Sequence, residues 1–422
     1  MAAGKTTRSR KRLTCSLALV GAWAVGFAGL APSAAAADMR AEQWYLDAMH
    51  VEDIWKKSTG KGIKVAVIDS GVNASTSALK GQVLAGLDAT KTDGKTDDIS
   101  GHGTTMAELI AGTGRGGSVQ GLAPGAKIIP FRTNIAGSKK FAKNRWAVED
   151  AIRAAADSDA KIINMSFAYP SKTQRLAEAV KYAHAKGKLL FAGVGNNGAD
   201  DNVRQFPAAF PEVVGVAATT SEGVVADFSQ HGAYVDIAAP GKDIPGWCDA
   251  KFTDYCVGQY GTSHATAIAS ASAALIWSAH PDWTANQVLR VMFESAGKGE
   301  DWKGKVSSHA GHGVVRPNAH LTRGLGKPGD PGVSPLAGEN TAAADGGSSA
   351  SPAASASPGT SAPGSSQSPQ DAPAPGSTVA GSSENAAKAD DGMPLGLVLG
   401  GAAAVVVVAG GAFVLARRRR TP

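Results

Sequence analysis

The sequence predicts an α/β fold in which a mostly parallel sheet is covered by helices on both faces. Between about residues 40 and 323, short apolar runs alternate with segments of helical periodicity. These runs are almost continuously apolar, which is typical of strands that are buried on both faces. One of them ends in an aspartate, Asp69, and functional side chains of parallel sheets lie at the carboxyl ends of the strands.

The individual elements follow from local patterns. Short apolar runs predict strands, and longer segments with apolar residues three or four positions apart predict helices. The predicted strands span 63–68, 127–131, 162–166, 189–194, 213–218 and 235–238. The predicted helices span 104–112, 146–157, 174–185, 263–279 and 284–295.

The amino-terminal segment, residues 1–37, predicts a secretory signal peptide. It contains five basic residues and no acidic residue, and these are followed by an apolar run and a stretch of small residues. The chain that remains after its removal begins near residue 38, and we expect one folded domain over 38–323.

The carboxyl-terminal part predicts a tether and a membrane anchor. Residues 324–392 are dominated by Pro, Gly, Ser and Ala, a composition that cannot bury enough apolar surface to fold, so we expect a disordered linker. Residues 393–416 carry no charge and predict a transmembrane helix, and Arg417–Arg420 follow. By the positive-inside rule the tail, 417–422, is cytoplasmic. We therefore expect a single-pass protein of the cell membrane, with the folded domain on the extracellular or cell-wall side.

The net charge of +6 gives no indication of nucleic-acid binding. Nine positive charges lie in the signal segment and the carboxyl-terminal tail, so the residues between them carry a net negative charge. Cys248 and Cys256 are the cysteines that remain after signal removal, and outside the membrane they are expected to form a disulfide. Two separate thiols are the alternative. We expect no metal site and no cofactor, because no cluster of His and Cys lies near them.

Three glycine-framed motifs supply an aspartate, a histidine and a serine in that order. VAVIDSGV contains Asp69, GHGTTMAELIAG contains His102 and YGTSHATA contains Ser263. A serine hydroxyl becomes a nucleophile when a histidine removes its proton and a carboxylate orients that histidine. Each residue taken alone has another interpretation. Asp69 could be a nucleotide or metal ligand, His102 could be a structural histidine, and Ser263 could be a helix N-cap.

A fourth motif, FAGVGNNG, supplies Asn196 in a glycine-flanked turn. A side-chain amide at this position can donate a hydrogen bond to an oxyanion. With these four motifs the chain resembles the subtilisin family of serine peptidases, from about Gln43 to Thr322. The resemblance implies a subtilisin-like three-layer domain in which Asp69, His102 and Ser263 form a catalytic triad. It also implies that Asn196 contributes to the oxyanion hole.

The same resemblance implies the substrate-binding residues and the partners. In the subtilisin family the backbone near Ser166, Phe167 and Ala168 pairs with the substrate as an added strand. Within that family the chain looks most like the mycosins, because of QWYLDAM after the signal, GHGVVRPNAHLT at the end of the domain, and the terminal anchor. The mycosins are membrane-anchored peptidases of type VII secretion, so this likeness implies a protein or peptide substrate and a secretion complex as a partner.

Several positions depart from the family pattern. Thr105 replaces a usual second histidine, Glu108 stands where a small residue is usual, and His264 follows the serine. A buried carboxylate without a partner is costly, so Glu108 is expected to find a partner or to lie near solvent. For His264 we expect a packing or hydrogen-bonding role.

The leading hypothesis is therefore an anchored serine endopeptidase that processes secretion-linked proteins. Two alternatives remain at this point. One is a scaffold or binding module on a subtilisin fold, which stabilises a secretion complex. The other is a general cell-surface protease of broad specificity.

Overall fold

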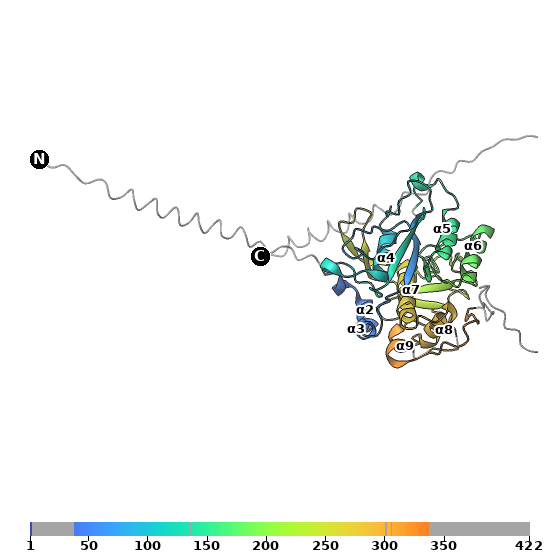
Figure 1. Ribbon diagram of the computed structural model, residues 1–422. Helices are drawn as coiled ribbons and strands as arrows, with labels where there is room; N and C mark the ends of the chain where they lie inside the picture. Colours follow the sequence, from blue (N-terminus) through green and yellow to red (C-terminus); the bar gives the residue numbers. More distant parts are fainter. Residues whose placement is uncertain (2–37, 136, 300–301, 305, 337–422) are drawn as a thin grey trace, which may run out of the picture. The chain divides into compact units, whose positions relative to one another are not determined.

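The apolar runs form one parallel sheet, as their composition predicts (Figure 1). The structure is a computed structural model that describes Met1 and residues 38–135, 137–299, 302–304 and 306–336. Within these residues the sheet has seven strands in the order β2-β3-β1-β4-β5-β6-β7, and all its pairings are parallel. The strands are β1 (Lys64–Asp69), β2 (Leu87–Asp88), β3 (Lys127–Arg132), β4 (Ile162–Met165), β5 (Leu189–Gly193), β6 (Val214–Thr219) and β7 (Ile237–Pro240).

Helices cover both faces of the sheet. Val65 and Val67 of β1 belong to an apolar cluster with α4 (His102–Ala111), α7 (Thr262–Ala279) and α8 (Ala285–Ser295). The intervening Ala66 and Ile68 face the other way, into a cluster with α5 (Ala147–Asp157) and α6 (Gln174–Ala185). Figure 1 shows α4 and α7 apart from the pair α5 and α6. The predicted α/β class with both faces covered is confirmed.

The register of the central strands brings their carboxyl ends together. Ile68 of β1 lies opposite Met165 of β4, and Asp69 pairs with Arg132 of β3 on the other side. Asp69 therefore ends its strand beside the residue that follows β4, Ser166. This edge of the sheet is where a parallel fold places its functional groups.

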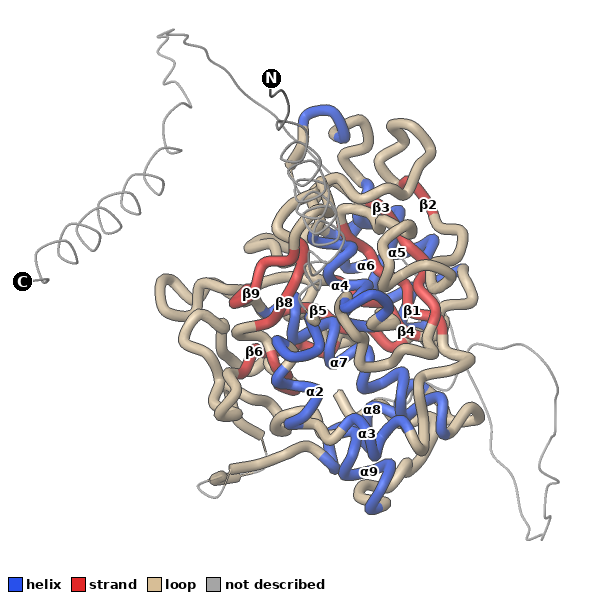
Figure 2. Tube along the Cα trace, turned by 90° about the vertical axis from the view of Figure 1, so that its left-hand side faces the viewer, coloured by secondary structure: helices blue, strands red, loops and turns tan. Residues whose placement is uncertain are grey.

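Short elements complete the domain (Figure 2). Cys248 and Cys256 form the expected disulfide within an antiparallel hairpin. The hairpin strands are β8 (Ile244–Trp247) and β9 (Tyr255–Gln259). The remaining elements are the 3-10 turns η1 (Met39–Glu42), η2 (Arg115–Gly117) and η3 (Lys139–Phe141), and the short helices α2 (Trp44–Ala48), α3 (Val51–Trp55) and α9 (Pro317–Arg323).

The ordered packing continues beyond the predicted domain boundary at residue 323. Arg290 of α8 donates a hydrogen bond to the carbonyl of Val333 at 2.8 Å, and Ser334 is buried. The domain therefore includes part of the stretch that the sequence assigns to the linker. None of the helices in the described part of the chain has the length and hydropathy needed to cross a bilayer. The predicted signal peptide and transmembrane helix lie outside the described residues.

Candidate active site

Asp69 and His102 form a hydrogen-bonded pair at the carboxyl edge of the sheet. The Nδ1 atom of His102 lies 2.8 Å from Oδ1 of Asp69, which is fully buried at the end of β1. Because this carboxylate can only accept, it places the imidazole proton on Nδ1 and leaves Nε2 as an acceptor. The arrangement is that of a general base held by a carboxylate.

A glycine allows α4 to approach β1 this closely. A Cβ atom on Gly103, the residue after His102, would lie 2.1 Å from the carbonyl oxygen of Gly71 and 3.0 Å from Cβ of Asp69. Any side chain at Gly103 would therefore push the start of the helix away from the strand.

The charge of Asp69 affects the protonation of His102. Burial alone would lower the pKa of His102, but the attraction of Asp69 and the hydrogen bond between them outweigh burial, and the pKa is raised above its usual value. The imidazole therefore becomes more basic in this setting than in water.

Asp98, which belongs to none of the motifs noted in the sequence, holds the turn that precedes α4. Its Oδ1 accepts hydrogen bonds from the hydroxyl of Ser70 at 2.7 Å and from the backbone of Ser100 and Gly101. Its Oδ2 accepts from both the backbone N–H and the hydroxyl of Thr104. The carboxylate thus satisfies N–H groups at a helix start, as an N-cap residue does. Its position a few residues before a predicted helix was the available signal.

Ser263 is the second residue of α7 and lies at the same edge of the sheet. Its hydroxyl donates to the carbonyl of Ser166 at 3.1 Å, and the hydroxyl of Ser166 donates back to the carbonyl of Ser263 at 3.1 Å. Through this pair the start of α7 is joined to the end of β4, next to Asp69. The Ser263 hydroxyl is not hydrogen-bonded to His102 in this conformation.

Asn196 follows β5, and Thr262 fixes the direction of its side chain. Its Oδ1 accepts from the backbone N–H of Thr262 at 2.9 Å and from the Thr262 hydroxyl at 3.0 Å. These two bonds assign the oxygen of the amide and leave its Nδ2 free to donate. Asn196 is exposed and lines the same cavity as Ser263.

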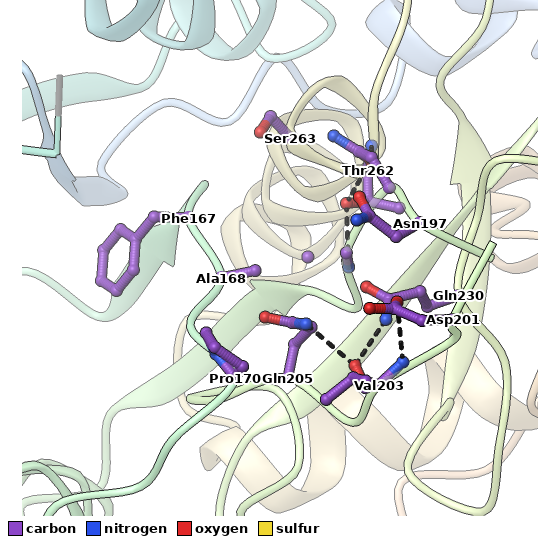
Figure 3. Close-up of a pocket in the computed structure, with 13 residues that line it drawn as sticks. Phe167, Ala168, Pro170, Asn197, Asp201, Val203, Gln205, Gln230, Thr262 and Ser263 are labelled. Carbon is purple, nitrogen blue, oxygen red and sulfur yellow. Dashed lines mark hydrogen bonds between the residues drawn. The ribbon is translucent and has the colours of Figure 1, made fainter. Parts of the chain in front are cut away.

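A cavity of about 470 Å³ opens beside Ser263 (Figure 3). Phe167 and Ala168 line it on one side, whereas Ser166 is buried behind them. Beyond Ala168, the backbone of Tyr169 exchanges two 2.8 Å hydrogen bonds with Phe206. The full lining comprises Phe167, Ala168, Pro170, Gly193, Gly195, Asn196, Asn197, Asp201, Val203, Gln205, Gln230, Thr262 and Ser263.

The unusual residues of α4 attach the helix to the disulfide hairpin. The hydroxyl of Thr105 accepts from the backbone N–H of Trp247 at 3.0 Å. Glu108 is 1% exposed, and its Oε2 accepts from the hydroxyl of Tyr255 at 2.8 Å. Burial raises the pKa of Glu108 to about 7, although hydrogen bonds act against this. The carboxyl group thus has the partner that its burial requires.

His264, next to Ser263, is buried. Its Nε2 lies 3.4 Å from Oε1 of Gln259, and burial together with the nearby charge of His102 lowers the pKa of His264 to about 3. It is therefore neutral, in keeping with a packing role. In the described part of the chain, no group of three or more His, Cys, Asp or Glu side chains is placed to hold a metal ion.

Sequence comparison identifies similar proteins. The model of the peptidase S8, or subtilase, family matches residues 60–313. Over 253 residues the chain is 34% identical to the minor extracellular protease Epr of Bacillus subtilis (strain 168), a match that covers 60% of this chain and 38% of Epr. It is 31% identical to thermitase of Thermoactinomyces vulgaris over 266 residues, which cover 60% of this chain and 90% of thermitase. Against several of its relatives the chain spans only between 38% and 62% of their length.

Structural comparison agrees. The MycP3 protease from the type VII (ESX-3) secretion system superposes with a TM-score of 0.55 and 29% identity, and the match covers 66% of this chain and 87% of MycP3. The family model covers more than half of the chain, including all four predicted catalytic residues. The chain therefore belongs to the subtilase family.

Proposed function

We propose that this chain is a serine endopeptidase that cleaves peptide bonds through an acyl-enzyme intermediate. His102 Nε2 removes the proton of the Ser263 hydroxyl as Oγ attacks the substrate carbonyl, and then gives that proton to the leaving amine. Asp69 holds the imidazole and stabilises its charged form. Water, activated by the same histidine, then hydrolyses the ester.

The observation that carries this proposal is the hydrogen bond between His102 and Asp69, which leaves Nε2 as an acceptor at the edge of the sheet where Ser263 also lies. In the present conformation Ser263 donates to the carbonyl of Ser166. A change of its χ1 angle between staggered rotamers releases this bond and turns Oγ toward the imidazole. Hydrogen bonds between a catalytic serine and histidine often form or tighten only when substrate is bound, so the absence of this bond in the free protein does not argue against the mechanism.

The oxyanion is held by Asn196 and by the backbone at the start of α7. The Nδ2 of Asn196 is left free by the bonds to Thr262, and the N–H of Ser263 lies in the first turn of α7, where N–H groups have no acceptor within the helix. Both sets of donors favour a negative charge on the attacked carbonyl oxygen. In a site closed to water, such donors provide a large part of the rate enhancement.

The substrate backbone adds as a strand along residues 166–168. These residues continue β4 beyond its last sheet pairing, and Phe167 and Ala168 form one wall of the cavity. An extended peptide pairs with such an edge through main-chain hydrogen bonds, and its alternate side chains enter pockets. We therefore assign Ser166, Phe167 and Ala168 to substrate binding.

Labelling with a fluorophosphonate tests the activity. Wild type is expected to react covalently, whereas Ser263→Ala is expected to remain unlabelled. Ser221→Ala removes an exposed serine hydroxyl elsewhere and serves as the matched control, with labelling retained. A folded wild-type protein that does not react would favour the alternative of a scaffold or binding module.

In the cell, we propose that the enzyme is anchored by residues 393–416 and processes proteins linked to type VII secretion. The uncharged segment before Arg417–Arg420 and the likeness to MycP3 support this proposal. Comparison of the secreted proteins of cells carrying wild type or Ser263→Ala is expected to reveal new uncut termini in the variant. Degradation of casein at many sites would instead favour a general cell-surface protease. Truncation after residue 392 tests the anchor, because the truncated protein is expected to be released into the medium.

A further inference from the structure

The cavity beside Ser263 is polar at the end farther from the serine. Figure 3 shows Ser263 at one end of the drawn residues and the group of Gln205, Val203 and Gln230 at the other. The cavity belongs to the site of the proposed peptidase, and the following inference rests on that function. In a peptidase such a pocket receives the side chain of the residue whose carbonyl is attacked.

One backbone carbonyl fixes the orientation of both glutamine amides. The Nε2 of Gln205 donates to the carbonyl of Val203 at 2.8 Å, and the Nε2 of Gln230 donates to the same oxygen. Because a carbonyl oxygen can only accept, neither amide can be flipped without placing two oxygens in contact. Both Oε1 atoms are therefore left as acceptors, and neither receives a hydrogen bond within the described part of the chain.

Asp201 adds a negative charge at the same end. Of the thirteen described residues that line the cavity, Asp201 alone carries a charge. Its Oδ1 accepts from the backbone N–H of Val203 at 3.3 Å, and it forms no ion pair with any described Lys, Arg or His. The nearby cation, Arg204, lies over the ring of Tyr234 and does not line the cavity. Asp201 is exposed, and no described cation lies within ion-pair distance of its carboxylate.

The walls between these two ends are less polar. Phe167, Ala168 and Pro170 line one side, and Gly193 lies against Thr262. Long basic side chains suit this arrangement, because their methylene stems cover apolar surface while their charged ends donate several hydrogen bonds. An acidic end group would meet both the Asp201 carboxylate and the amide oxygens, and an aliphatic one would leave these acceptors without donors.

We infer that this cavity selects a lysine or arginine side chain on the residue whose carbonyl Ser263 attacks, and that Asp201 determines this preference. The amide oxygens of Gln205 and Gln230 accept hydrogen bonds from the ammonium or guanidinium group. Asp201 supplies the opposite charge. The substrate class of the enzyme is therefore a polypeptide cut after a basic residue.

A series of fluorogenic tetrapeptides that differ only in the residue before the scissile bond tests the inference. Lysine is compared with norleucine, and arginine with citrulline, since each pair shares most of its shape but differs in charge. We expect kcat/KM for lysine and arginine to exceed that of the uncharged partner by roughly tenfold or more, as for a hydrogen bond to a charged group. The ratio is expected to fall with added salt, because screening weakens an attraction between charges but leaves a fit of shape unchanged.

Variants of Asp201 assign the preference to one residue. Asp201→Asn keeps an oxygen for the N–H of Val203 and removes the charge, so the lysine-to-norleucine ratio should drop several-fold. Asp201→Lys should shift the preference toward glutamate. Asp200→Asn is the matched control, because Asp200 is exposed, carries the same charge and does not line the cavity, so its ratio should equal that of wild type.

The outcomes separate this inference from the proposed function. If Ser263 reacts with the fluorophosphonate but norleucine or citrulline peptides are cleaved as well as the basic ones, the inference is overturned and the peptidase proposal stands. The same holds if Asp201→Asn and Asp201→Lys leave the ratios unchanged. If wild type neither reacts nor cleaves any peptide, the proposed function fails and this inference fails with it.

Discussion

Thr262 orients Asn196 through two hydrogen bonds to a single atom. The backbone N–H and the hydroxyl of Thr262 both reach Oδ1 of Asn196, at 2.9 and 3.0 Å. The same hydroxyl accepts from the N–H of Gly195 at 3.2 Å, so it joins the turn after β5 to the start of α7. The residue before Ser263 therefore controls which end of the amide faces the cavity.

Removal of the Thr262 hydroxyl is expected to weaken oxyanion binding, because this hydroxyl helps to fix the Asn196 amide. Thr262→Val should lower kcat about tenfold, because the Asn196 amide loses one of the two bonds that fix it. Asn196→Ala should lower kcat by about 100–1,000-fold, since a whole donor is lost. Thr262→Ser retains the hydroxyl and is the matched control. Steady-state kinetics would contradict this role if the serine and valine variants were equally impaired, or if only KM changed.

The activity is expected to fall at acidic pH through the titration of His102. The imidazole must be neutral to accept the serine proton, and Asp69 raises its pKa above the usual 6.5 in spite of burial. The acidic limb of the kcat/KM profile should therefore have a midpoint above 6.5. Asp69→Asn should move this limb to lower pH and reduce kcat on the order of 10⁴-fold, because the charge and the tautomer are both lost. A limb that does not move in Asp69→Asn would assign the titration to another group.

Asp98 is expected to position His102 rather than to take part in the chemistry. In Asp98→Asn, an NH₂ group replaces Oδ2. The backbone N–H of Thr104, which donates to Oδ2 in wild type, then faces a donor and loses its acceptor. We expect a loss of about 1–3 kcal/mol in unfolding free energy, as for an unsatisfied buried group, together with a lower kcat. Because the charge of Asp98 also raises the pKa of His102, but less than that of Asp69 does, the midpoint of the pH profile should move to lower pH by less than it does in Asp69→Asn. Asp97→Asn, next to it, is the control for charge.

Much of this site could be predicted because its residues stand at the ends of regular elements. The apolar run of β1 pointed to Asp69, and α6 has the bounds that its periodicity predicts, Gln174–Ala185. Ser263 was placed at the start of a helix, which in the structure begins one residue earlier at Thr262. These residues lie where buried strands and helix starts leave little choice of conformation.

Other elements of the fold lack the hydrophobic pattern by which they could be predicted from the sequence. The strand β2 is only two residues long, and its Leu87 is exposed. The hairpin strand β9 is mostly half-buried or exposed, so it lacks the apolar run that marks a core strand. The helix α4 begins at His102, two residues before the predicted start, because the Asp98 carboxylate satisfies the N–H groups of its first turn. The partner of Glu108 could not be predicted either, because Tyr255 is 147 residues away in the sequence.

The buried Glu108 is expected to make the protein less stable as the pH rises. Its pKa is raised from 4.5 to about 7 in the folded protein, mainly by burial. Between these two values the folded state holds a proton that the unfolded state has lost, so the free energy of unfolding decreases with increasing pH. A shift of this size corresponds to about 3 kcal/mol, lost progressively between pH 4.5 and pH 7 and fully lost above it.

Glu108→Gln separates this contribution from others. The glutamine oxygen can still accept from the Tyr255 hydroxyl, but it cannot ionise, so the stability of the variant should decline less steeply with pH than that of wild type. Denaturant unfolding at several pH values should show the stability difference between variant and wild type growing by up to about 3 kcal/mol from pH 4.5 to pH 8. Asp236, whose pKa burial also raises to about 7, provides a control, because Asp236→Asn should remove a separate share of the slope. If the difference stays constant across this range, the Glu108 carboxyl is already ionised in the folded protein at acidic pH, and burial does not raise its pKa.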